Sequence, residues 1–507
     1  MNANSLKLNA KRTILVGLAF YLIMAFWQAY DTIVPKILTD KFGMAQWLSG
    51  VIMALDNILA LFLLPFFGAL SDKCKHKRGK RTPFIFIGTL LSCLAIVGII
   101  FSDGVQSRLL EEVDAHNPTA LQTLYEADPV IRVDGQKGAL SSFIEEEAFL
   151  ALEDAETEDY TTYVVSARRS YAKVQTQSNA APLFFFVLTL LVALLAMGFF
   201  RSPAVALMPD VTPKPLRSKG NAVINLLGAC GTVSLIGIGM LFGTGDAQNA
   251  LSPYGGYFAA LAGVMLVALL IFLFTVKEPL WAKEAQEQDC FFEGKDEESV
   301  SGDRKLTKGE KRSLILLLAS VALWYMGFNA VTTKFSVYAA PELNMDFNSA
   351  MLVAQIAGLA SFLPAGMIAS KIGRKRSILI GVAMLGSAMA VMAFVTKQTP
   401  VFLPIACFVV AGLGWGMINV NSFPMVVELA TGGNVGKYTG YYYTASMAAQ
   451  TITPVLSGAL MDLDMRTLFP YSALFVALSF VTMLFVKHGD SKPVKKGSVL
   501  EQMDVGD

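Results

Sequence analysis

The stretch that decides the fold is Gly68-Ala-Leu-Ser-Asp-Lys-Cys-Lys-His-Lys-Arg-Gly-Lys-Arg-Thr-Pro83, a short and strongly basic loop between two long apolar segments. About a dozen apolar segments of roughly 20 residues recur along the chain, separated by polar loops. A segment of this length satisfies its backbone groups inside a bilayer only as a helix. The pattern therefore predicts an all-α protein that crosses the membrane many times.

The composition agrees with a membrane protein. Hydrophobic residues make up 54% of the 507 residues, charged residues make up 16%, and the mean hydropathy is +0.51. The net charge is +1 and the basic residues are spread over separate loops, so we expect no nucleic-acid partner. The five cysteines lack any C-x-x-C spacing, so we expect no metal site. The first apolar segment has no small-residue cleavage pattern, which favours an uncleaved helix over a signal peptide.

The apolar segments predict twelve helices in two groups of six. The first group covers residues 13–38, 45–70, 83–101, 182–209, 219–242 and 256–276. The second group covers residues 312–339, 348–369, 377–395, 400–427, 438–461 and 468–486. The chain thus divides into a first half (1–276), a central cytoplasmic loop (277–311), a second half (312–486) and a tail (487–507).

The short loops predict the orientation. Loop 71–82 carries six lysines and arginines and loop 370–376 carries four, and such loops lie in the cytoplasm. We therefore expect a multi-pass protein of the plasma membrane with both termini in the cytoplasm. Residues 102–181 then form an acidic insert outside the cell, either a small lid or a solvated spacer. The spacing of Phe143, Ala148, Phe149 and Leu152 favours partial helical structure in that insert.

The two halves repeat each other weakly. Asp56 lies nine residues before Pro65 in the second segment, and Gln355 lies nine residues before Pro364 in the eighth. The motif Gly68-x-x-x-Asp-Lys73 after the second segment is answered by Gly366-x-x-x-Ser-Lys371 after the eighth. Internal repeats of this kind are typical of transporter architectures.

These motifs, followed by glycine and paired basic residues, resemble those of the major facilitator superfamily, and the resemblance extends over nearly the whole chain. The loop 72–84 and the run Pro203-Ala-Val-Ala-Leu-Met-Pro-Asp-Val-Thr-Pro213, with Arg217 beyond it, are similar to glycoside-pentoside-hexuronide cation symporters, above all to sucrose-type proton symporters. The resemblance implies two pseudo-symmetric six-helix halves, alternating access, and a sugar that moves with a cation.

The chain departs from these relatives at informative positions. Plant-type sucrose symporters carry an arginine where this chain has Val205, and this chain has Arg201 instead. Asp31 could match an aspartate of the melibiose-type relatives, but their aspartate pair in the second segment has the single counterpart Asp56. A proton is therefore favoured over sodium as the coupling ion, and no other cofactor is expected.

Three ionisable residues in the apolar segments are candidates for proton coupling. A charge at membrane depth is costly unless paired or hydrated, so it indicates function. Asp56 is the leading candidate for the carrier, with Arg201 as its partner and Asp31 as a further carboxylate. The alternative is a structural Asp56–Arg201 pair. Asp31 and Lys334 either close an outer gate together or are plain interfacial charges.

Sugar recognition needs aromatic faces and converging amide or hydroxyl groups. The candidate binding residues are Trp27, Gln28, Tyr30, Asn57, Asn225, Trp324, Asn329, Lys334, Gln355, Trp415, Asn419, Asn421 and Gln450. The amides among them could instead join helices to one another. Opposite charges at the cytoplasmic ends could form a reversible gate. These residues are Asp72, Lys73, Asp210, Arg217, Lys371, Arg374, Glu428 and Lys437.

Taken together, the residues and the resemblance predict a monomeric secondary transporter, not an enzyme, whose partners are the bilayer and a small sugar. The predicted activity is symport of a glycoside or oligosaccharide, such as sucrose or maltose, with a proton. An uncoupled facilitator and a carrier of a non-sugar solute remain alternatives. A membrane sensor would need a signalling domain that 277–311 is too short to form, and the motifs H-E-x-x-H and G-x-S-x-G of intramembrane enzymes are absent.

Overall fold

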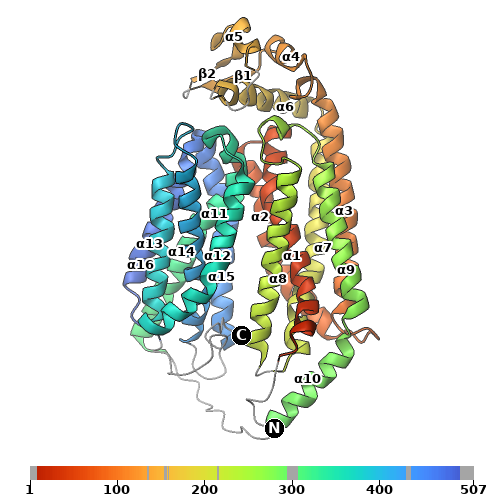
Figure 1. The fold of residues 1–507 in the computed structure, drawn as a ribbon, viewed down its shortest axis with the longest axis vertical. Coiled ribbons are helices and arrows are strands. Elements are labelled where there is room, and N and C mark those ends of the chain that lie inside the picture. The colour runs from red at the N-terminus through yellow and green to blue at the C-terminus, as the bar shows by residue number, and fades with distance from the viewer. Residues whose placement is uncertain are drawn as a thin grey trace.

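Twelve long helices in two groups of six dominate the computed structural model, which describes residues 8–133, 136–152, 157, 159–213, 216–293, 306–429 and 435–490 (Figure 1). The first group is α1 (Ala10–Lys36), which continues as the π-helix η2 (Ile37–Lys41), then α2 (Gln46–Asp72), α3 (Thr82–Leu109), α7 (Ala181–Val211), α8 (Arg217–Leu241) and α9 (Gly255–Thr275). The second group is α11 (Lys308–Leu343), α12 (Phe347–Ile372), α13 (Arg374–Met392), α14 (Phe402–Val427), α15 (Val435–Leu463) and α16 (Leu468–Leu484).

Ten helices in the described ranges are long and apolar enough to cross a membrane. α12, whose apolar part is Phe347–Phe362, and α15 complete the two groups of six. The predicted fold class is therefore confirmed. The clearest difference in length is at α3, which reaches Leu109 instead of residue 101. Its polar last turns continue the helix because Ser102, Asp103 and Gln106 are buried there against neighbouring segments.

Close packing holds each half together. In the first half α3 packs on α7 and α1 packs on α8, whereas in the second half α12 and α13 both pack on α14. Glycines permit this approach: a Cβ at Gly412 would lie 2.2 Å from the carbonyl oxygen of Ala354. A Cβ at Gly414 would lie 2.6 Å from the carbonyl oxygen of Gly381. The backbones of α12, α13 and α14 therefore touch directly.

The halves meet where α2 begins and α15 ends, at what we call the cap end. The backbone N–H groups of Gln46 and Trp47 donate to the carboxylate of Asp462 at 2.8 and 2.9 Å. The fully buried Lys334 of α11 donates to the carbonyl oxygen of Gln46 at 2.8 Å. A Cβ at Gly458 would lie 2.4 Å from that same carbonyl oxygen. The two halves are thus sealed together at the cap end.

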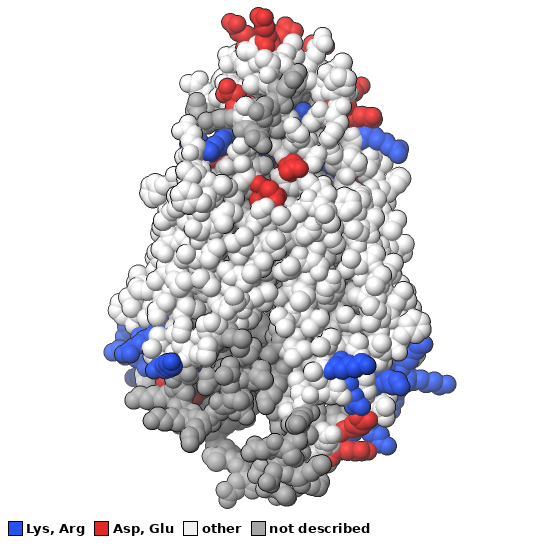
Figure 2. All heavy atoms as spheres, viewed as in Figure 1, with Lys and Arg blue, Asp and Glu red and all other residues white. Residues whose placement is uncertain are grey.

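The opposite end, which we call the basic end, carries the loop 73–81 and the basic segment 371–376 around Gly373, where α12 ends and α13 begins. Lysines and arginines gather at this end in the space-filling view (Figure 2). The helix α10 (Glu278–Glu293) lies here and packs against α7, so part of the predicted central loop is helical. The buried carboxylate of Glu278 accepts hydrogen bonds from the backbone N–H groups of Arg81 and Thr82 at 2.9 and 2.8 Å. It therefore caps the N-terminus of α3.

The described residues between 110 and 180, which we call the cap, form a small folded unit above the bundle (Figure 1). Its elements are η3 (Glu111–Val113), α4 (Ala120–Glu126), β1 (Val130–Val133), β2 (Gln136–Ala139), η4 (Leu140–Ser142), α5 (Glu146–Leu150), η5 (Tyr160–Val165) and α6 (Ser166–Ser178). The antiparallel hairpin β1–β2 pairs Val130 with Ala139 and was not predicted. The helical structure that the spacing of Phe143, Ala148, Phe149 and Leu152 favours is the short α5, whose Phe149 is fully buried. The insert is a lid-like unit, not a solvated spacer.

Candidate functional site

Three of the predicted residues line one small cavity inside the first half. Trp27 comes from α1, Asp56 from α2 and Arg201 from α7. The cavity has a volume of about 10 Å³, which is room for roughly one water molecule. The rest of its wall is apolar and consists of Leu59, Ala60, Leu63, Leu64, Leu194 and Gly198. An aspartate and an arginine therefore share a small chamber whose wall is otherwise apolar.

Arg201 is the electrostatic centre of this cluster. Its guanidinium carbon lies 5.2 Å from the centre of the Trp27 ring, a cation–π contact. Its charge acts on Asp56, on Asp31 of α1 and on Tyr443 of the second half. No nitrogen of Arg201 lies within 4.0 Å of a carboxylate oxygen of Asp56 in the part of the chain that the structure describes. In this conformation the two residues are thus neighbours without a direct ion pair.

Buried hydrogen-bond donors occur near this cluster and in the second half. The Nδ2 of Asn57 donates to Asp56 at 2.8 Å. Trp27 Nε1, Trp324 Nε1 and Asn329 Nδ2 are buried and have no acceptor among the described residues. Such donors are costly to leave unsatisfied, so Trp27 and Asn329 are suited to binding a hydroxyl oxygen. The fully buried Trp324 is instead part of the core of the second half.

An aromatic cluster lies in the second half. Trp415 stacks on Phe328 with ring centres 3.6 Å apart and meets the edge of Tyr325 at 5.2 Å. Tyr442 lies against Tyr325 and shares a 3.0 Å hydrogen bond with Ser422. Of these, the sequence reasoning identified Trp415 alone. The run Tyr441-Tyr-Tyr443 in α15 was the signal that could have found Tyr442.

The other predicted binding residues are dispersed. Gln28, Asn57, Gln355, Asn419 and Gln450 are half-buried, and Asn225 is exposed. Tyr30 donates its hydroxyl to backbone carbonyls of α2. Asn421 is buried and donates to Ser377 of α13 at 3.1 Å, so it joins two helices. Lys334 is fully buried and bonds Gln46 at the cap end. The bridge to Asp31, one of the two alternatives for these residues, is not formed among the described residues in this conformation.

The charges of the basic end pair within each half. The sequence reasoning used Arg81 only as one of the basic residues of loop 71–82 that predict the orientation. In the structure it binds Asp210 at 2.8 Å and Asp72 at 2.5 Å. Burial opposes the charge of Arg81, but these two carboxylates outweigh it and raise the pKa of the guanidinium. Arg374 binds Glu428 at 3.2 Å.

The remaining residues of the predicted gate have other surroundings. Arg217 reaches Asp289 of α10 at 3.8 Å. Lys73 and Lys371 are exposed, and the side chain of Lys437 lies outside the described residues.

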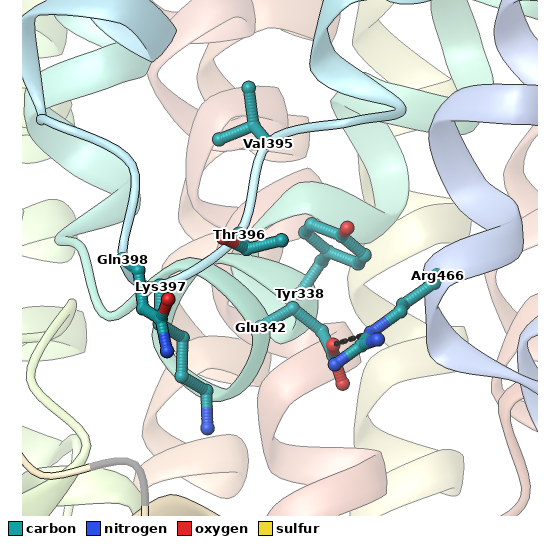
Figure 3. Close-up of a pocket in the computed structure, with 7 residues that line it drawn as sticks. All are labelled: Tyr338, Glu342, Val395, Thr396, Lys397, Gln398 and Arg466. Atoms are coloured by element: carbon teal, nitrogen blue, oxygen red, sulfur yellow. Dashed lines mark hydrogen bonds and ion pairs between the residues drawn. The ribbon is translucent and has the colours of Figure 1, made fainter.

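A second pocket lies at the cap end of the second half (Figure 3). It has a volume of about 160 Å³ and is lined by Tyr338, Glu342, the loop 395–398 and Arg466. Arg466 donates to Glu342 across the pocket at 3.4 Å. Its residues were not predicted as site residues. Among the described residues, no group of three acidic, histidine or cysteine side chains could hold a metal ion.

Two six-helix halves with charged and aromatic side chains between their helices define a polytopic carrier-type bundle. The family described as Major Facilitator Superfamily matches residues 174–430 and 354–502. The description MFS/sugar transport protein matches residues 15–108. Because the first match covers more than half of the chain, this protein belongs to the Major Facilitator Superfamily. The resemblance found in the sequence is thus confirmed.

Similarity to individual relatives is local. The chain is 38% identical over 60 residues to Sucrose transport protein SUC3 of Arabidopsis thaliana, which is 12% of this chain and 10% of that protein. It is 33% identical over 63 residues to Sucrose transport protein SUT3 of Oryza sativa subsp. indica, 12% of each chain. The chain thus matches about a tenth of the length of these curated relatives.

Similarity to solved structures extends over the whole bundle. The inward-open conformation of the xylose transporter XylE from E. coli matches with a TM-score of 0.60 and 14% identity over 97% of this chain and 99% of that one. A D-xylose-proton symporter matches with a TM-score of 0.60 and 15% identity over 94% and 98%. At these identities the matches show the fold.

Proposed function

We propose that this protein is a secondary transporter that carries a sugar of the glycoside or oligosaccharide class across the membrane by alternating access, together with a proton. The observation that carries the proposal is the shared cavity of Trp27, Asp56 and Arg201. The sugar-transport description over residues 15–108 and the short matches to sucrose transport proteins support the substrate class.

Asp56 is the proposed proton carrier. Its chamber is sized for a water molecule, so it suits a proton better than a hydrated metal cation. The positive charge of Arg201 beside it also disfavours sodium. When Asp56 is ionised, it attracts Arg201, and when it is protonated, the guanidinium becomes available to a sugar hydroxyl. Asp31 lies in the same field and shares this electrostatic role.

The sugar itself needs more room than this chamber offers. We place it between the chamber and the aromatic cluster of the second half, where Tyr443 is half exposed. The Trp27 and Trp415 rings would offer apolar faces to the sugar, and Trp27 Nε1 and Asn329 Nδ2 would supply donors. Binding across the midline draws the two halves together, which is what alternating access requires.

The distribution of charge supports the proposed orientation in the membrane and the proposed gate at the basic end. The positive-inside rule places the basic end in the cytoplasm and the cap outside, with both termini in the cytoplasm of a plasma-membrane protein. The pairs Arg81–Asp210, Arg81–Asp72 and Arg374–Glu428 are partly solvated contacts that can exchange partners as the basic end opens and closes. We propose that the monomer is the working unit.

The test uses purified protein in liposomes that enclose a pH-sensitive dye, with sucrose, maltose and other glycosides added outside in turn. We expect sugar-dependent acidification of the lumen. Asp56→Asn should abolish accumulation of labelled sugar while exchange of bound sugar persists. Glu287→Gln, an exposed carboxylate of α10, is the matched control and should behave as wild type. Accumulation by Asp56→Asn at the wild-type level would exclude Asp56 as the carrier, and silence toward every sugar in both assays would exclude the substrate class.

A further inference from the structure

The cap has a hydrophobic core of its own. Phe149, Leu124 and Val164 are fully buried in it, and residues from η3 to α6 contribute. A unit with such a core moves as one body, because displacing any part of it would expose apolar surface. Its contacts with the two halves therefore decide how it behaves when the halves move apart.

Buried contacts anchor the cap to the first half. Arg169 of α6 binds the buried Asp40 of η2 at 2.7 Å. Beneath it, within the first half itself, Lys41 of η2 and Asp103 of α3 form an ion pair at 2.5 Å with neither side chain exposed, which fixes the segment that Arg169 binds. Gln106 of α3 donates to the hydroxyl of the buried Thr176 in α6 at 3.3 Å. Detaching the cap would leave the buried Asp40 without its guanidinium partner and would break the buried Gln106–Thr176 bond, so this attachment is costly to open.

Attachment to the second half is much lighter. Arg132 of β1 donates to the carbonyl oxygens of Asp462 and Leu463, at the end of α15, at 3.1 and 3.3 Å. Lys397, in the loop between α13 and α14, donates to the hydroxyl of Thr161 in η5. Arg132 is exposed, so its hydrogen bonds compete with water. The Arg132 bonds therefore exchange readily with water, whereas Thr161 is buried.

The two contacts with the second half, made by Arg132 and Lys397, lie on either side of the pocket of Figure 3. Lys397 lines one side of it, and Arg466, a few residues after Asp462 and Leu463, lines another. The carboxylate of Asp462 also accepts hydrogen bonds from the backbone N–H groups of Gln46 and Trp47 in the first half. The cap therefore contacts the second half beside the residues through which the two halves contact each other.

From this arrangement we propose that the cap is a strap: it stays fixed to the first half and holds the second half only while the cap end is closed, and so favours the closed conformation. The proposal rests on the alternating access proposed above. Opening the cap end must separate Gln46 from Asp462. Because the cap moves with the first half, it must also separate Arg132 from its two carbonyl acceptors. The buried contacts between the cap and the first half remain, so the contacts between the cap and the second half break.

The experiment measures the cap-end distance in the full-length protein in nanodiscs. Nitroxide labels on cysteines at Leu241 and Phe394, both strongly exposed, report the separation by pulsed electron resonance, with Cys74, Cys230 and Cys290 replaced. Arg132→Ala and, separately, Thr161→Val should raise the ratio of open to closed populations roughly two- to tenfold, as expected for losing one or two such bonds. The matched control is Lys137→Ala, the cross-strand partner of Arg132 in the hairpin.

The outcomes separate the strap from the transport cycle. A wild-type distance that changes with sugar or proton gradient, together with a larger open fraction in both variants and not in the control, supports the strap. The same wild-type change with unaltered distributions in both variants overturns the strap and leaves alternating access intact. A wild-type distance that no sugar and no proton gradient changes overturns the proposed cycle itself.

Discussion

At the scale of single residues, the indole N–H of Trp27 is the donor that we propose binds a hydroxyl of the sugar. It is buried beside Arg201 and Asp56 and has no acceptor within the described residues. Trp324 has an unpartnered indole as well, but it is fully enclosed by the core of the second half. The two residues therefore provide a matched pair that separates a binding role from a packing role.

We expect Trp27→Phe to raise the KM for the transported sugar roughly two- to tenfold, because it keeps a ring and removes one hydrogen-bond donor. Trp324→Phe removes the same donor in the core and should leave KM unchanged. The measurement is initial uptake of labelled sugar into liposomes at a fixed proton gradient. Equal effects of the two substitutions would argue that the indole of Trp27 does not contact substrate.

At the scale of elements, the loop between α8 and α9 faces the turn between α11 and α12 across the seam at the cap end. Asn348 donates to Thr244 at 3.0 Å, and a Cβ at Gly245 would collide with the carboxylate of Asp346. Asp346 caps α12 through the N–H groups of Asn348 and Ser349 at 3.0 Å. Partial burial and the facing Asp346 raise the pKa of Asp246, against the opposing effect of Lys36.

This raised pKa predicts a pH dependence of the closed seam. Closure favours the protonated form of Asp246, so this contribution is fully present below the ordinary aspartate pKa and is lost as the pH rises through the raised one. Lowering the pH on the cap side should therefore increase the closed population, measured by the same nitroxide distance. Asp246→Asn should remove this part of the pH dependence. A variant that retains the full wild-type dependence would assign it to other groups.

Sequence reasoning predicted the helices and the basic loops, because a bilayer requires long apolar segments and favours basic residues on one side. Helix number and the basic loops follow from hydropathy and charge, and the placement of Asp56 with Arg201 follows from their depth in neighbouring segments. It missed partners that depend on three-dimensional proximity. Lys334 bonds a backbone carbonyl of α2, and Arg81 lies between two acids of different helices. The core of the cap depends on packing between short elements whose periodicity is too brief to predict.

At the scale of the whole molecule, the seal between the halves depends on close backbone approach of α2 and α15. A Cβ at Gly50 would lie 2.1 Å from the carbonyl oxygen of Pro454, and one at Gly458 would lie 2.4 Å from that of Gln46. Backbone atoms cannot turn aside as a flexible side chain can. Any larger residue at these positions must push the halves apart at the cap end.

We expect Gly458→Val to hold the cap end open and to reduce sugar transport at least about tenfold, as for a conformational equilibrium shifted by more than 1.4 kcal/mol. Gly440→Val on the same helix is the control, since a Cβ there would meet nothing within 4 Å. Labelling of cap-end cysteines by an impermeant maleimide, together with uptake, measures both effects. Full transport by Gly458→Val would mean that the seal tolerates a wider spacing.

The core of the cap also has a consequence for how the chain is assembled. Leu251, in the segment between α8 and α9, is 2% exposed and belongs to that core, although about 70 residues and two membrane-spanning helices separate it from the end of the cap sequence. The cap therefore cannot complete its interior while the chain is still being inserted up to α8. Its folding must wait until the segment before α9 has reached the same side of the membrane, so a protease-resistant cap would mark a correctly threaded first half.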